Sequence, residues 1–463
     1  MSVISAVLSA NRTYNIEQAF NAKDITTATM RNAVTDWYSL YYCDANNDTE
    51  DTSQRLPVSV VSKLYKAIFS EYIATADGAK SGFVDEIIRG LDGVRKRAVQ
   101  KMLVGGRCYI KPLLGQPMAF GVIDRRSYIP LGRDGSGNIT DIGTWEQTQT
   151  GNLTYTLLER RTVDNAGYLT IENKLYRSDV PDSLGTGVPL NTLDKYASLE
   201  PTMTLPEPVF SIGLIPLECP AENCVDGSLD PVSVYAAACG LIHNINRNEA
   251  QINTEFENGR SRIFVSDDLL RKDKNGNRQF DRTLFVGIDD DPDKAGVTIF
   301  SPELREQSYL ARKTEYLRNI ESLIGMKRGV LSEVESTEKT ATEITSSAGE
   351  YNLTIIDFQQ SWTAAVREAV RVCNILGQMY HLCDSTGVDP EKDVTISWGN
   401  GILYDEDQAW TDYKAMVSAG MLKPEIALGW YFDMPTDTPA DIAAIREKYM
   451  PEMPEDDNAE DNF

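Results

Sequence analysis

The chain has 463 residues and a formal net charge of −24, with 41% hydrophobic and 25% charged residues. This composition is typical of globular proteins with a sizeable core, and the length allows two to four domains of roughly 100–200 residues each. An acidic chain is a poor clamp for nucleic acid, which needs a basic face, but it could line a channel through which DNA slides.

The cysteines and the terminal sequence indicate where the chain is made. The seven cysteines are scattered and odd in number, which favours reduced thiols and synthesis in the cytoplasm. No charged segment followed by an apolar core opens the chain, so no secretory signal is expected. The sequence contains no run of about 18 apolar residues, so we expect no membrane-spanning segment.

Apolar residues recur at helical spacing twice before residue 105, over Val61–Tyr72 and Phe83–Met102. Gly105-Gly106 predicts the end of the second helix. From 107 to 217 the pattern changes to short runs rich in β-branched and aromatic residues, separated by turn sequences such as Asp134–Asn138. We therefore expect N-terminal helices followed by a strand-rich subdomain.

A helix, a small β module and a second helix are predicted next. Asp230-Pro231 is a typical helix start, and the apolar spacing predicts a helix over 230–258. Residues 260–302 contain the hairpin sequence Asn275-Gly276 and three strand-like runs, at Arg262–Val265, Leu284–Ile288 and Val297–Phe300. The second helix is predicted from about Pro302 to Gly325, and the polar residues 326–340 that follow it are typical of a mobile loop.

Residues 340–383 carry the longest helical pattern, which corresponds to roughly 65 Å at about 1.5 Å per residue. A helix of this length acts as a spine, and Gly349 and Gly377 mark points at which it could break. A strand at Val394–Trp398 and short helices at about 406–419 and 423–430 follow. The acidic tail, residues 450–463, is expected to be disordered.

The sequence offers little that could perform catalysis. No GxxxxGK[ST], GxGxxG, HExxH or GxSxG motif occurs, and neither His243 nor His381 has a catalytic motif around it. The run Asp289–Asp293 fits an acidic turn better than a calcium loop, because Lys294 stands where the loop requires glycine. We therefore expect a non-enzymatic chain with no cofactor and no metal ion. A metal-dependent nuclease built from scattered acids remains an alternative, with candidates such as Asp141, Asp405 and Asp407.

Several local strings and their order resemble the portal proteins of tailed bacteriophages, from about residue 35 to 435. The strings are Ser62–Glu71, Leu214-Ile215-Pro216 with Asn223, Thr340–Ile344, and Trp398–Gly401 with Asp405. The order of helix, β module, helix, loop and long helix matches the stem, clip, stem, tunnel loop and spine of that family.

The resemblance implies an α+β fold, mainly helical and elongated, with a wing, stem, clip, small crown and long spine helix. The implied regions are a wing at 1–229, a stem helix at 230–259, a clip at 260–302, a second stem helix at 303–325, a tunnel loop at 326–340, the spine helix and return strand of the wing at 341–404, a small helical crown at 405–449 and the acidic tail at 450–463.

The resemblance also implies a function. Portal proteins form a closed ring, usually of about twelve copies, at one capsid vertex of the virion, and DNA enters and leaves through it. The implied partners are further copies of the chain, double-stranded DNA, the terminase large subunit that drives packaging with ATP, the major capsid and scaffolding proteins, and a head–tail adaptor. Another phage head–tail or tail-assembly protein is the main alternative, which the number of subunits would distinguish.

Two groups of residues are expected to make the contacts. Lys327, Arg328 and Lys339, in the implied tunnel loop, are expected to touch the DNA backbone transiently, since acids between them keep the contact weak. An ordinary solvated loop is the alternative. The β module has exposed strand edges suited to a partner's strand, with the docking candidates Arg271, Lys272, Lys274, Asn275 and Arg278.

Overall fold

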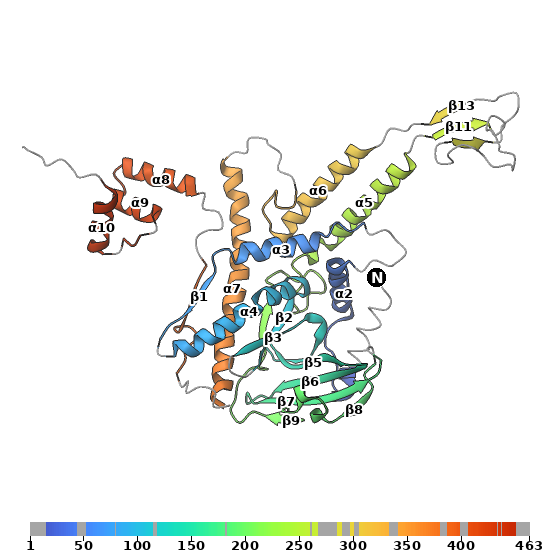
Figure 1. Ribbon diagram of the computed structural model, residues 1–463, viewed down its shortest axis with the longest axis vertical. Coiled ribbons are helices and arrows are strands. Elements are labelled where there is room, and N and C mark those ends of the chain that lie inside the picture. Colours follow the sequence, from blue (N-terminus) through green and yellow to red (C-terminus); the bar gives the residue numbers. More distant parts are fainter. Residues whose placement is uncertain are drawn as a thin grey trace, which may run out of the picture. The chain divides into compact units, whose positions relative to one another are not determined.

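A computed structural model of the chain consists of two compact units, Met1–Trp398 and Gly399–Phe463. The structure describes residues 15–43, 52–78, 80–113, 118–180, 183–259, 262–266, 285–288, 297–300, 305–332, 341–379, 387–398, 406–432, 434–436 and 438–450. Helices and sheets both build the first unit, as the α+β prediction requires (Figure 1). No described helix is long and apolar enough to span a membrane.

The N-terminal helices of the first unit are α2 (Ala28–Tyr42), α3 (Leu56–Ile68) and α4 (Ser81–Gly105). The helices predicted from the apolar spacing correspond to α3 and α4, and α2 was not predicted. Gly106 ends α4 with φ 81°, and a Cβ there would lie 2.3 Å from the carbonyl oxygen of Pro231. Only glycine fits this backbone and this close approach, so the predicted stop is confirmed.

The strand-rich subdomain contains two antiparallel sheets. The smaller sheet has the order β10-β2-β3, from Ile215–Glu218, Arg107–Leu113 and Ala119–Ile123. The larger one has the order β4-β5-β6-β7-β8, with β9 beside β7, from Tyr128–Arg133, Ile139–Thr150, Leu153–Val163, Leu169–Ser178, Thr186–Val188 and Thr202–Thr204. Short 3-10 turns lie at Arg125–Ser127, Leu190–Thr192 and Asp194–Tyr196. The predicted strand-rich block is confirmed.

The next helix, α5 (Cys239–Asn258), begins later than predicted, after a 3-10 turn at Ala236–Ala238. Asp230 does not cap a helix, because it is buried between Arg107 and Arg133. Residues 231–235 run instead along the end of α4, where Val234 N–H and Ser233 Oγ both donate to the carbonyl of Leu103, at 3.0 Å each. These groups are therefore bonded to residues distant in the sequence, and they do not form the first turn of a helix, which Asp230-Pro231 had predicted.

The β module has the order β12-β11-β13, from Phe285–Ile288, Arg262–Ser266 and Val297–Phe300. All three predicted strands are confirmed. Strands β11 and β12 pair in parallel, so the two strands do not themselves form a hairpin. Asn275-Gly276 itself lies outside the described residues.

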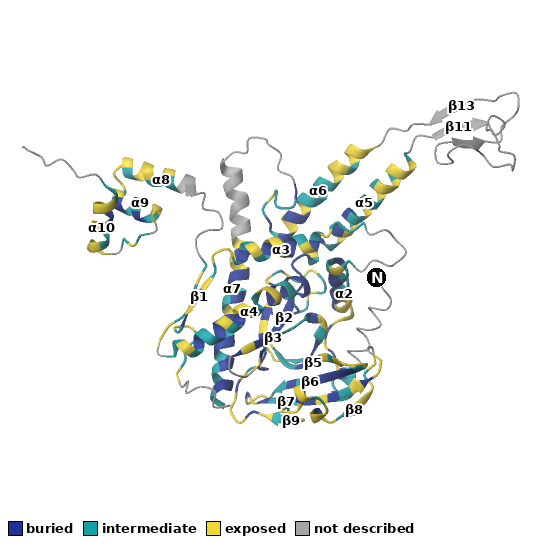
Figure 2. Cartoon of the chain, viewed as in Figure 1, coloured by how far each residue is buried: buried dark blue, intermediate teal, exposed yellow. Residues whose placement is uncertain are grey.

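After the module, α6 (Glu306–Ile324) runs back beside α5, and α7 (Ala341–Met379) is the long helix predicted from the sequence. The 39 residues of α7 are continuous through Gly349 and Gly377, so the break did not occur. From Leu353 onward its buried face packs on the rest of the unit (Figure 2) and includes Phe358, Trp362 and Val372. Two strands, β1 (Ile73–Ala76) and β14 (Val394–Ser397), pair antiparallel.

The second unit contains α8 (Glu406–Ser418), α9 (Pro424–Tyr431) and α10 (Pro439–Tyr449). Aromatic pairs such as Trp410 with Tyr431 hold it together, and Arg446 of α10 pairs with the buried Glu425 of α9. The first two helices agree with the predicted ones. The third was missed, although Thr438 and Asp441 form a capping box that marks its start.

Candidate functional site

The helices α5 and α6 pack side by side through polar contacts. Asn248 Nδ2 donates to the carbonyl of Tyr309 at 3.2 Å, and Lys313 pairs with Glu249 at 3.0 Å. Near the far ends of the helices, Arg305 binds both carboxylate oxygens of Glu255, at 3.0 and 2.7 Å.

The buried residues of this helix pair lie in the first half of α5 and the last turns of α6, away from the β module. The buried residues of α5 are Ile242, Ile245 and Asn248, and those of α6 are Ile320, Glu321 and Ile324. Nearer the β module, Phe256 and Leu310 stay 45% and 47% exposed, and Leu323, beside the buried Ile324, is 51% exposed. The pair therefore presents apolar surface that its own fold leaves uncovered.

A groove of about 480 Å³ lies between α5 and α6. Its lining contains hydrogen-bond donors of three arginines, two tyrosines and four amide or hydroxyl residues and no carboxylate, namely Asn244, Arg247, Asn248, Gln251, Arg305, Ser308, Tyr309, Arg312 and Tyr316. Such a lining is unusual in a chain of net charge −24. Arginine and amide donors are the usual partners of phosphate and carboxylate, and one of these arginines, Arg305, already binds Glu255.

The segment after α6 is folded around one buried acid. Glu321 is 0% exposed, and its carboxylate accepts hydrogen bonds from the backbone N–H groups of Gly329, Leu331 and Ser332 and from Ser332 Oγ. Three of these distances are 3.1 Å from Gly329 N, 2.9 Å from Ser332 N and 2.8 Å from Ser332 Oγ. The first half of the predicted mobile loop is therefore ordered.

Two of the three predicted DNA-contact residues lie within the described part of the chain. Lys327 is half-buried and Arg328 is exposed. Lys339 lies outside the described residues, and so do all five docking candidates of the β module, Arg271, Lys272, Lys274, Asn275 and Arg278. Sequence reasoning missed Glu321, although its place between Ile320 and Ile324 on the apolar face of a helix was a signal, because acids are rarely buried without partners.

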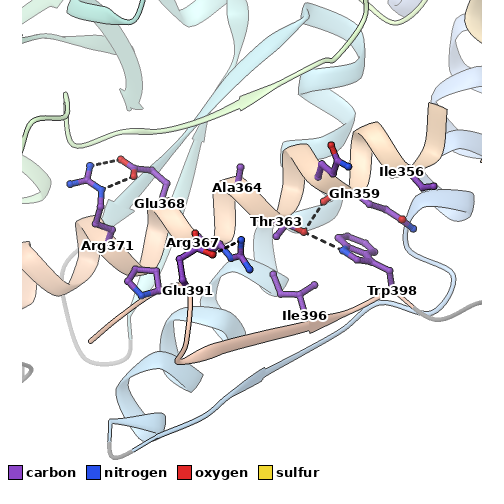
Figure 3. A pocket seen from close by; sticks show the side chains of 12 residues that line it. Ile356, Gln359, Thr363, Ala364, Arg367, Glu368, Arg371, Glu391, Ile396 and Trp398 are labelled. Atoms are coloured by element: carbon purple, nitrogen blue, oxygen red, sulfur yellow. Dashed lines mark hydrogen bonds and ion pairs between the residues drawn. The ribbon is translucent and has the colours of Figure 1, made fainter. Parts of the chain in front are cut away.

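A second cavity, of about 710 Å³, runs along α7 beside β14 (Figure 3). Its charged side chains pair with one another, Arg367 with Glu391 and Arg371 with Glu368, both at 2.7 Å. Trp398 Nε1 donates to Thr363 Oγ1 at 3.2 Å. The cavity holds no nucleophile with an adjacent base, so its geometry does not suggest catalysis.

A third cavity, of about 560 Å³, is lined from both sheets and contains Glu159 of β6. Glu159 is buried, with Lys111 Nζ at 2.6 Å and Arg161 Nε at 2.7 Å from its carboxylate. Burial alone would raise the pKa of Glu159, but Arg161 and Lys111 outweigh it and lower the pKa to about 2. The carboxylate is thus a permanently charged structural group and not a proton donor at neutral pH.

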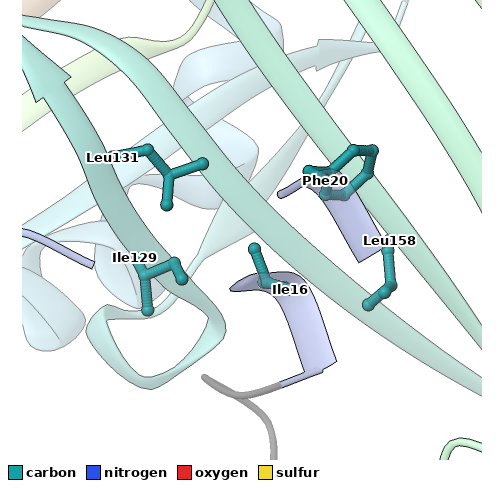
Figure 4. Close-up of a cluster of buried hydrophobic side chains, with 5 residues drawn as sticks. All are labelled: Ile16, Phe20, Ile129, Leu131 and Leu158. Carbon is teal, nitrogen blue, oxygen red and sulfur yellow. The ribbon is translucent and has the colours of Figure 1, made fainter. Parts of the chain in front are cut away.

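The neighbouring residue of the same strand faces the other way. Leu158 packs against Ile16 and Phe20 from the first helical turn and against Ile129 and Leu131 of β4 (Figure 4). Because side chains alternate along a strand, β6 places an apolar cluster on one face and the Glu159 ion pairs on the other. The N-terminal turn therefore covers the sheet on the side opposite the cavity.

His243 is not placed for catalysis. His243 is half-exposed on α5, and its Nε2 lies 3.0 Å from a carboxylate oxygen of Asp36 on α2. The hydrogen bond to Asp36 raises the pKa of His243 above its ordinary value. His381 lies outside the described residues. Within the described ranges, no group of three or more His, Cys, Asp or Glu side chains could hold a metal ion.

Comparisons with known proteins identify the family. The family model described as phage portal protein, SPP1 Gp6-like, matches residues 90–452. No curated protein matches the chain. Among solved structures, a chain in the neck of the native gene transfer agent (GTA) particle, computed with C12 symmetry, has 13% identity and a TM-score of 0.45, over 89% of this chain and 96% of that one. A chain in the virion of the native GTA particle has 10% identity and a TM-score of 0.44, over 87% and 99%.

The family model spans most of the chain and includes both sheets, the α5–β module–α6 segment, α7 and the helices of the second unit. The resemblance drawn from the order of the sequence strings is thereby confirmed. The chain belongs to the SPP1 Gp6-like family of phage portal proteins and is a structural protein of the virion.

Proposed function

We propose that the chain forms a closed ring of about twelve copies at one capsid vertex, and that double-stranded DNA enters and leaves the capsid through its centre. The order of elements within residues 90–452 carries this proposal: a stem helix, a β module, a second stem helix and a spine helix. In a closed ring each copy uses one surface to meet a different surface of its neighbour.

The apolar residues exposed on α5 and α6 support assembly through the stem. Phe256, Leu310 and Leu323 are each about half-exposed in the single chain. Covering such a side chain stabilises an interface by about 1.5–3 kcal/mol at most, so a ring that repeats these contacts between all neighbours would be stable. The test is negative-stain imaging and native mass spectrometry of the purified protein, in which we expect rings with a central hole. A monodisperse monomer at micromolar concentration would refute the proposal, and a hexamer or filament would favour a tail protein.

Lys327, Arg328 and Lys339 are the proposed DNA contacts. In a ring every basic residue is repeated in each copy, so a single lysine becomes a belt of positive charge around the duplex. Phosphate contacts of this kind carry no sequence information and weaken with salt, which suits sliding DNA. Changing all three residues to alanine should leave capsid assembly normal but alter DNA packaging or genome retention. Normal packaging and retention would leave these residues without an electrostatic role.

The β module is the proposed docking surface for the terminase large subunit during packaging and for a head–tail adaptor afterwards. Its central strand β11 is paired on both sides, so the outer strands β12 and β13 supply the edges that a partner could extend. Deleting residues 270–282, which contain Arg271, Lys272, Lys274, Asn275 and Arg278, should preserve rings and abolish terminase binding. Retained binding would place the docking surface elsewhere. The major capsid and scaffolding proteins are proposed partners of the ring's outer surface.

A further inference from the structure

The segment between α6 and α7 starts from a buried anchor. Glu321 lies in the last turn of α6, and its fully buried carboxylate accepts from Gly329, Leu331 and Ser332. An ionised carboxylate offers only acceptors, and burying one costs several kcal/mol unless donors surround it. Residues 329–332 supply those donors. The carboxylate and the segment therefore depend on each other: the acid stays buried only while the segment keeps this path.

The path fixes the backbone that carries the two cations. Val330 N–H donates to the carbonyl of Lys327 at 3.2 Å, and Gly329 has φ 91°. These features define a turn over residues 327–330 in which Gly329 occupies the third position, where a type II turn requires a positive φ. Arg328 therefore occupies the corner of the turn, where it is exposed.

A second helix holds the same segment. Lys63 Nζ of α3 donates to the carbonyl of Val330. Gly325, with φ 73°, ends α6 beside α7, and a Cβ there would lie 2.4 Å from Thr354 Oγ1. The segment is thus tied to α3 and α6, and Glu321 makes more of its hydrogen bonds than any other side chain described there.

We propose that Glu321 is a positioning residue, which holds the turn at 327–330 so that Lys327 and Arg328 face DNA in a fixed place before DNA arrives. This inference rests on the proposed DNA contact of those two residues. A pre-ordered turn does not lose backbone entropy when DNA passes, whereas a free loop would lose it at each contact. In the proposed ring, the same anchor would place Lys327 and Arg328 of every copy at the same position along the ring axis.

The first test measures the anchor itself. In purified Glu321→Gln rings the amide group offers a single oxygen and turns an N–H₂ group toward the backbone donors. Hydrogen exchange of the amides of Gly329, Leu331 and Ser332 should accelerate about tenfold to a hundredfold, as expected for the loss of hydrogen bonds to a charged acceptor. Glu315→Gln, at an exposed position of the same helix, is the matched control and should change nothing. Unchanged exchange in Glu321→Gln would overturn the proposal.

The second test asks whether Glu321 acts through the cations. The fraction of capsids that retain a full genome is measured for Glu321→Gln, for Lys327→Ala with Arg328→Ala, and for all three changes together. Residues that act as one unit give non-additive effects, so the triple variant should match the double alanine variant. A triple variant in which the two losses add would show that Glu321 supports the ring in general, and would refute positioning.

The outcomes separate this inference from the proposed function. If the double alanine variant retains genomes normally, the proposed DNA contact fails, and so does the role of Glu321 in presenting it, even where exchange shows the anchor intact. If Glu321→Gln does not assemble, Ser332→Ala replaces it, because it removes one of the four donor groups and keeps the acid. In Ser332→Ala, hydrogen exchange should accelerate at the same amides but by a smaller factor than in Glu321→Gln. Unchanged exchange in Ser332→Ala would count against the anchor.

Discussion

Replacing Glu159 by glutamine would remove the negative charge between two cations, Lys111 of the small sheet and Arg161 of the large one. Lys111 and Arg161 would remain, with side chains 21% and 8% exposed, and Arg161 would still be fixed by the carbonyls of Ile212 and Gly213. Breaking a buried ion pair by removing one partner costs about 3–5 kcal/mol, since the other charge stays buried. The lowering of the pKa of Glu159 from 4.5 to about 2 gives a similar figure, about 3 kcal/mol at about 1.4 kcal/mol per pKa unit.

The sign of the pH dependence follows from the lowered pKa. The folded state holds Glu159 ionised, so its stabilisation is complete above pH 4.5 and is lost as the pH falls toward about 2. Glu159→Gln should therefore be less stable than the natural chain by about 3 kcal/mol at pH 7, and this difference should shrink in acid below pH 4.5.

Hydrogen exchange of peptides from β5, β6 and β7 at increasing urea would measure these free energies. Glu172→Gln is the matched control, because Glu172 faces Arg160 across the same strands at 3.7 Å but is 37% exposed. We expect it to cost less than about 1 kcal/mol. Equal losses in the two variants at pH 7, or a pH-independent difference for Glu159→Gln, would refute the electrostatic reasoning.

Other positions give further expectations. Gly93 lies inside α4 with no heavy atom within 4 Å of an added Cβ, so Gly93→Ala should raise the free energy of unfolding by about 0.5–1 kcal/mol in a urea titration; a loss would show a hidden contact. The raised pKa of His243 means that its pair with Asp36 stabilises fully below pH 6.5 and fades as the pH rises through the folded pKa. His243→Gln should therefore flatten the fall in Tm above pH 6.5 in calorimetry, and parallel curves would contradict this. Phe256→Asp combined with Leu310→Asp should give folded chains by circular dichroism but no rings by native mass spectrometry, and normal rings would argue against assembly through the stem.

The sequence predicts the elements whose signals are local. Apolar spacing locates α4, α6 and α7, and the alternation of strands and turns locates the sheets, because these patterns reflect burial on one face. The predicted start of α5 was wrong because Asp230 pairs with Arg107 and Arg133, which are distant in the sequence. A local sequence pattern contains no information about such partners. Glu321 was missed for the same reason: its partners lie eight to eleven residues further on, beyond the helix in which it was read.

The burial of Asp230 has a mechanical consequence. Arg107 belongs to β2 of the small sheet and Arg133 to β4 of the large one, and both cations meet the single carboxylate that precedes α5. Tension along α5 would therefore divide between two sheets instead of passing down one strand of the chain. With the load shared between two sheets, no single ladder of hydrogen bonds can be peeled apart bond by bond.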